Sequence, residues 1–206
     1  MMSEYQYLYD GILNQLKETA TTTFNLFSHA YELLNEDLDK SEKEFKDLII
    51  QGEYVLKSMP FYNDKFIDIK ESDDLFYVIQ ILSLLIKAEH NLVVINRHNK
   101  LEENIPYYLG MKSYYQGELY FYYQLMIYKG IDEKTKTIID LYYKEAKFEN
   151  VHLLIGDMLY IIFMKEHHKE IDKSISLNED DINSLRKINN KEINRVLDRY
   201  NSLSNS

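Results

Sequence analysis

Apolar residues recur every three or four positions along most of this chain, and this spacing predicts helices rather than strands. The first such stripe runs from about Glu4 to about Leu34, and the second runs from Ser41 to just before Pro60. We expect Ser41 to cap the second helix, because an acidic residue follows it three positions later. Residues 60–71 are expected to form a loop, since the residue before a proline avoids helical geometry.

The rest of the chain continues the helical pattern. A third helix is predicted from Ser72 to about Arg97, and its first half is apolar on nearly all sides, as in helices at the centre of a core. Pro106 suits the first turn of a fourth helix, and Gly130 suits its C-terminal cap. Three further helices are predicted at about 132–147, 150–169 and 178–200.

Composition agrees with a helical fold. Two prolines and six glycines in 206 residues are too few for the many turns of a sandwich or barrel. The length suits one core, so we predict a single all-α domain over residues 1–200, with about seven helices packed as antiparallel hairpins in a bundle. Residues 201–206, rich in Ser and Asn, are expected to be a disordered tail.

Other absences narrow the class of protein. The chain has no cysteine, which excludes disulfides and cysteine-bound metals within it and fits a reducing compartment. No secretory signal pattern is visible, and the longest apolar stretch is about half of what a bilayer requires. We therefore expect a cytoplasmic protein that does not enter a membrane.

Charge is distributed unevenly along the chain. Residues 1–74 carry a net charge of −9, whereas residues 75–150 carry 0 and residues 151–206 carry −1. Phosphate contacts need lysine and arginine, so this balance argues against binding to nucleic acid. It favours a basic protein partner, which an acidic surface attracts and steers.

Two groups of residues are candidates for that binding surface. One is acidic and lies in the first third of the chain, and the other is part of a tyrosine-rich segment near its middle, where exposed rings would act as interface anchors. The candidates are Glu36, Asp37, Asp39, Asp64 and Asp68, with Tyr114, Tyr120 and Tyr123.

A metal site is the alternative. Glu149 and His152 are one helical turn apart, and Glu89 and His90 fall on apolar stripes of the third helix. Carboxylate-bridged di-iron bundles need the Glu-x-x-His pair twice, and this chain has it once. These four residues could form a site only if the third and sixth helices are neighbours.

The patterns favour a binding protein over an enzyme. No phosphate-binding loop, nucleophile elbow or metalloprotease helix is present, and we expect no cofactor. The leading hypothesis is a non-enzymatic protein-binding module, of the inhibitor or immunity type, that neutralises a basic partner. The alternatives are a helical metal-binding enzyme or sensor with the internal Glu/His site, and a helical regulatory domain that binds a peptide in a groove.

Overall fold

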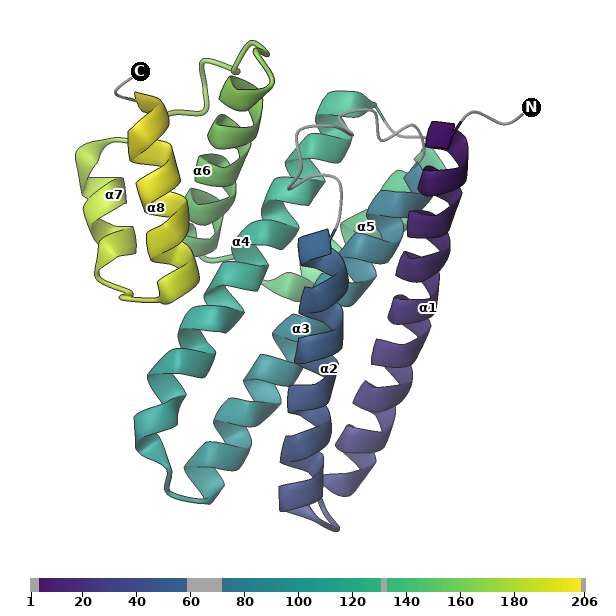
Figure 1. Cartoon of the computed structure of the whole chain (residues 1–206). Coiled ribbons are helices and arrows are strands. Elements are labelled where there is room, and N and C mark those ends of the chain that lie inside the picture. The colour runs from purple at the N-terminus through teal and green to yellow at the C-terminus, as the bar shows by residue number, and fades with distance from the viewer. Residues whose placement is uncertain (1–3, 59–71, 131–132, 205–206) are drawn as a thin grey trace.

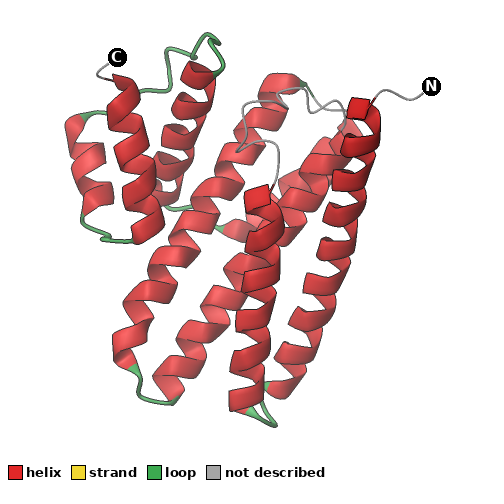
Figure 2. Ribbon diagram, in the orientation of Figure 1, coloured by secondary structure: helices red, strands yellow, loops and turns green. Residues whose placement is uncertain are grey.

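The computed structural model describes residues 4–58, 72–130 and 133–204, and in these ranges it contains helices and no strands (Figures 1 and 2). The all-α prediction is therefore confirmed. The elements in chain order are α1 (Glu4–Leu33), α2 (Leu38–Ser58), α3 (Ser72–His98), the short 3₁₀ helix η2 (Glu102–Asn104), α4 (Ile105–Lys129), α5 (Glu133–Ala146), α6 (Asn150–Glu166), α7 (Glu179–Arg186) and α8 (Lys191–Ser204).

Helix α3 lies at the centre of the bundle, where it contacts α1, α2, α4 and α5. Its buried side chains include Val78, Ile79, Leu82 and Leu85, each fully enclosed. Among the described helices, α3 is also long and apolar enough to cross a membrane by length and composition. However, 72% of its apolar window is buried by neighbouring helices, which is the pattern of a core helix.

Helix α4 joins the two sides of the molecule. It packs against α3 on one side and against α6 and α8 on the other, so few of its faces reach solvent (Figure 1). Glycines allow the close approach of α4 and α6. A Cβ atom on Gly117 would lie 2.2 Å from Ile155 Cγ2, and one on Gly156 would lie 2.4 Å from Tyr120 Cδ1.

The start of α2 differs from the sequence prediction. The helix begins at Leu38, and Asp37 caps it by accepting a hydrogen bond from the Lys40 backbone N–H at 3.0 Å. Ser41 is buried inside the helix, where its hydroxyl donates to the Ala30 carbonyl of α1 at 2.7 Å. The capping pattern at Ser41 was misleading because tertiary packing uses that hydroxyl to join two helices.

The predicted sixth helix ends three residues early. After Glu166 the chain turns at His168, which has a φ of 51°, and the Lys169 N–H donates to the Met164 carbonyl at 2.8 Å. The His168 N–H donates to the Lys165 carbonyl at 3.1 Å. These two bonds form a Schellman motif, which ends a helix without requiring glycine.

The predicted seventh helix is two helices. Asn178 caps α7 as expected, with its Oδ1 accepting from the Asp181 N–H at 3.0 Å. Asn189 then adopts a φ of 51°, and Asn190 begins α8 by accepting from the Glu192 N–H at 2.9 Å. The apolar stripe continues through this break, so periodicity alone predicted one helix.

The other helix boundaries agree closely with the sequence. Pro106 lies in the first turn of α4, and Gly130 caps its end with a φ of 74°. Helix α8 continues to Ser204, so the predicted disordered tail begins in helix, while 205–206 lie outside the described residues. The expected loop at 60–71 also lies outside them.

Candidate functional site

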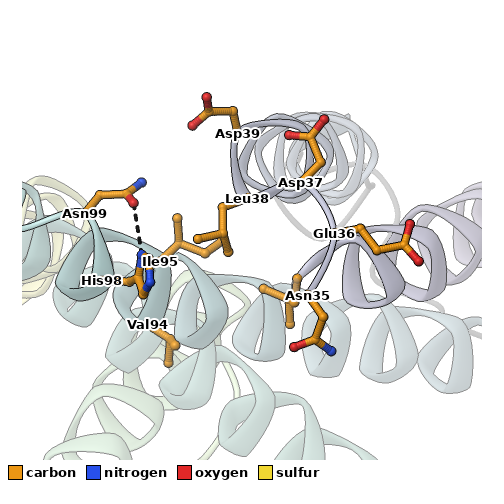
Figure 3. Close-up of a pocket in the computed structure, with 10 residues that line it drawn as sticks. Asn35, Glu36, Asp37, Leu38, Asp39, Val94, Ile95, His98 and Asn99 are labelled. Carbon is orange, nitrogen blue, oxygen red and sulfur yellow. Dashed lines mark hydrogen bonds between the residues drawn. The ribbon is translucent and has the colours of Figure 1, made fainter.

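An open pocket of about 810 Å³ lies beside the turn between α1 and α2, against the last turns of α3. Figure 3 shows the acidic side chains spread around the turn, with Leu38 directed toward Ile95 of α3. The lining residues are Leu34, Asn35, Glu36, Asp37, Leu38, Asp39, Val94, Ile95, His98 and Asn99. Three of the predicted binding residues thus lie around one concave surface.

The three acids of this pocket have different roles. Asp37 is committed to the N-terminal cap of α2, as described above. Glu36 and Asp39 are exposed, and in the described part of the chain neither forms an ion pair. These two carboxylates are therefore available to an incoming cation.

The floor of the pocket is apolar and comes from α3 and the α1–α2 turn. Val94 is 46% exposed there, so an apolar side chain of α3 is open to solvent beside the acids. His98 Nδ1 lies 3.3 Å from Asn99 Oδ1 at the pocket edge (Figure 3). An apolar floor with carboxylates at the rim suits a long side chain with an aliphatic stem and a cationic head.

The predicted tyrosine anchors lie elsewhere, on α4, and two of the three contact α5. Tyr114 is 6% exposed and its hydroxyl donates to Glu118 Oε1 at 2.7 Å. Tyr123 donates to Asp140 Oδ1 of α5 at 3.1 Å. Tyr120 packs its ring against Tyr143 of α5 and against Phe148 in the α5–α6 connection. Burial, with a contribution from Asp157, raises the pKa of Tyr120 to about 12. These rings are not part of the acidic pocket.

Two of the predicted acids, Asp64 and Asp68, lie outside the described residues. The sequence alone also missed the contribution of Val94 and His98. Only the tertiary fold brings these two α3 residues beside the α1–α2 turn. No pattern in the sequence distinguishes Val94 from the other apolar residues of α3.

The candidate metal ligands do not form one site. The Glu149 N–H donates to His152 Nδ1 at 2.9 Å, so the pair caps α6, and burial lowers the pKa of His152. His90 is exposed on α3, contrary to the expectation that it faces an apolar surface, whereas Glu89 is buried. Across the ranges that the structure covers, no three His, Asp or Glu side chains are placed to hold a metal ion.

Glu89 belongs instead to a buried polar cluster between α2, α3 and α4. It is 1% exposed, and its Oε2 has no hydrogen-bond partner among the described residues. Burial, with the nearby Glu53 carboxylate, raises the pKa of Glu89 to about 8. The carboxyl group is therefore mostly protonated at neutral pH.

The neighbouring Glu53 was not identified from the sequence, although it lies one turn before Leu56 on the apolar face of α2. Its Oε1 accepts a hydrogen bond from the Tyr115 hydroxyl, and its Oε2 pairs with Lys57 Nζ at 3.0 Å. Burial and this carboxylate raise the pKa of Tyr115. The cavity beside them encloses only about 10 Å³, which leaves no room for a substrate.

Replacing Tyr115 with Phe should therefore destabilise the fold rather than alter a reaction. The change removes the hydroxyl that donates to Glu53, and we expect a loss of roughly 1–3 kcal/mol in the free energy of unfolding. Urea denaturation would measure it. Tyr54→Phe, at a side chain that is 69% exposed, is the matched control and should leave the urea midpoint unchanged.

Comparisons with protein-family models, with curated protein sequences and with solved structures gave no match to this chain. The candidate sites therefore have to be judged by their own geometry.

Proposed function

We propose that the protein is a non-enzymatic binding module whose acidic pocket receives a basic segment of a partner protein. The observation that carries this proposal is that two carboxylates without an ion pair lie beside an exposed apolar floor in one concave surface. Glu36 and Asp39, on either side of the turn, would each attract a lysine or arginine of that segment, and Val94 would pack against an aliphatic stem.

The long-range charge of the chain supports the same partner. Residues 4–58, which form α1, α2 and the turn between them, carry 11 acids against 5 lysines, so the field around these two helices attracts a basic surface. Such steering mainly raises the rate of association and weakens with salt. Neutralising a basic partner, as an inhibitor or immunity-type protein does, is the role we propose for this surface.

The direct test uses a short synthetic peptide rich in lysine and arginine and the double variant Glu36→Gln/Asp39→Asn. This variant leaves the Asp37 cap of α2 intact, so the fold should persist. We expect peptide affinity to fall by roughly three- to thirtyfold, because each exposed ion pair contributes up to about 1 kcal/mol. Isothermal titration calorimetry at low salt would measure it.

The matched control is Glu179→Gln/Asp180→Asn, which removes the same charge from α7, away from the pocket (Figure 1). It should leave peptide affinity close to that of the wild type. An equal loss in both double variants would show attraction to net charge alone and would contradict a specific site. Binding that is undiminished at high salt would contradict the electrostatic mechanism.

A further inference from the structure

A second pocket, of about 550 Å³, lies between the C-terminal half of α4, helix α6 and the segment that follows α6. Its volume is in the range of small-molecule sites. The rings of Tyr128 and Tyr160 form one wall, with their centroids 6.5 Å apart and edge to face. Tyr128 is 50% exposed and Ile127 is 54% exposed, so two large side chains of α4 are open to a ligand here.

The opposite wall is the segment after α6, and local bonds fix its path. The Schellman motif at His168 turns the chain back toward α4. Asp172 Oδ1 then accepts from both the backbone N–H and the hydroxyl of Ser174, each at 2.9 Å. The Ile175 N–H donates to the Asp172 carbonyl at 2.9 Å. Hydrogen bonds within the chain therefore hold this wall of the pocket in place without a ligand.

The charged groups that line this pocket are carboxylates. Gln124 donates through its Nε2 to Asp157 Oδ1 at 2.6 Å, while its Oε1 is buried without a partner in the described part of the chain. Glu170 and Asp172 also line the pocket and form no ion pair with any described residue. The hydrogen bonds from Ser174 lower the pKa of Asp172, so this carboxylate is ionised at neutral pH.

Positive charge is missing from the lining of the pocket. No lysine, arginine or histidine is among its described lining residues, and Lys169 and Lys173, which flank the two acids in sequence, do not line it. Aromatic faces attract cations, and the exposed carboxylates of Glu170 and Asp172 line the same pocket as the half-exposed ring of Tyr128. Two isoleucines, Ile171 and Ile175, complete an apolar surface beside the carboxylates.

We propose that this pocket binds a small organic cation, an amine with an apolar or aromatic body. The ammonium group lies against Glu170 and Asp172 and the half-exposed ring of Tyr128. The body of the ligand packs on Ile127, Ile171 and Ile175. This site is separate from the acidic pocket and does not depend on the function proposed for it.

The test compares 2-phenylethylammonium with 2-phenylethanol, which has nearly the same shape and no charge. Chemical-shift titration by NMR should show the cation binding at this pocket with the roughly millimolar affinity of a fragment, and the alcohol binding about tenfold more weakly or not at all. The Gln124 side-chain amide and the Tyr128 ring signals report the location.

Variants make the test specific. Glu170→Gln/Asp172→Asn keeps an oxygen at position 172 to accept from Ser174, so the wall should persist while affinity for the cation falls about tenfold. Tyr128→Leu should weaken the cation several-fold. Tyr54→Leu, at an exposed tyrosine of α2, is the control and should bind as the wild type does.

Three results would overturn the proposal. They are equal binding of the alcohol and the cation, unchanged affinity in Glu170→Gln/Asp172→Asn, and no shift at Gln124 or Tyr128. A fourth arm uses the N-acetyl methylamide of lysine as a stand-in for a protein side chain. If it binds more tightly than 2-phenylethylammonium, the occupant is a lysine of a partner, which overturns the assignment to a free amine.

Discussion

Gly156→Ala is expected to lower the free energy of unfolding by roughly 1–3 kcal/mol, because it forces α4 and α6 apart. The added Cβ would meet the Gly117 carbonyl oxygen at 2.9 Å and the Phe121 backbone nitrogen at 3.1 Å, as well as the ring of Tyr120 at 2.4 Å. Backbone atoms cannot rotate away as side chains can. The loss should appear despite the roughly 1 kcal/mol that alanine gains over glycine in a helix.

Gly52→Ala is the matched control, since Gly52 is also a buried glycine within a helix. Its Cβ would meet Leu85 Cδ2 at 2.9 Å and Ile81 Cγ2 at 3.1 Å, which are side-chain atoms and not backbone. Urea denaturation should therefore place the midpoint of Gly52→Ala closer to that of the wild type than the midpoint of Gly156→Ala, which should lie well below it. If the two variants have equal midpoints, the close α4–α6 contact does not limit stability.

Glu89→Gln is expected to make the protein progressively more stable than the wild type as the pH rises. The folded-state pKa of Glu89 is raised to about 8 from an unfolded value near 4.5, chiefly by burial. Between these values the folded state holds a proton that the unfolded state has released, so wild-type stability falls as pH rises. Below pH 4.5 both states are protonated and the penalty vanishes.

The expected effect is large. Across this pH window the linkage amounts to on the order of 4 kcal/mol, and it reaches its full size only above pH 8. Glutamine resembles the protonated acid in shape and does not titrate. Urea midpoints of the two proteins should therefore nearly coincide at pH 5 and differ clearly at pH 8.5.

Other groups titrate in both proteins, so the difference between the wild type and Glu89→Gln isolates this carboxyl. Parallel stability curves from pH 5 to pH 8.5 would mean that Glu89 reaches solvent or finds a donor in solution. A larger gap at pH 5 than at pH 8.5 would have the wrong sign and would equally contradict the buried, unpartnered carboxyl.

Local sequence patterns were sufficient for most helix boundaries. Pro106, Gly130 and Asn178 act where predicted, because their effects depend on backbone geometry within one turn. The prediction that Ser41 caps α2 was wrong, because its hydroxyl donates to the Ala30 carbonyl of α1. The break between α7 and α8 at Asn189 and Asn190 was not predicted, because an apolar stripe can continue where the helix itself does not.

The candidate sites were predictable to different degrees. The acids at 36, 37 and 39 could be found as an acidic run, since charge is visible in sequence. The apolar floor beside them could not be predicted, because Val94 lies in α3, more than fifty residues later in the chain. Glu89 was identified from its position on an apolar stripe, but its partner carboxylate Glu53 required knowing which helices are neighbours.

By itself, the sequence determined that the chain is helical and that one central helix is apolar on nearly all sides. It also determined that negative charge concentrates in the first third of the chain. Helical periodicity and net charge are properties of residues close together in the chain. Only the tertiary structure decided that Glu149 and His152 cap α6, that Glu89 is enclosed beside Glu53, and that the acidic pocket and the tyrosine-lined pocket lie apart. Those outcomes depend on which helix faces meet, and this is decided by the packing of segments that are far apart in the sequence.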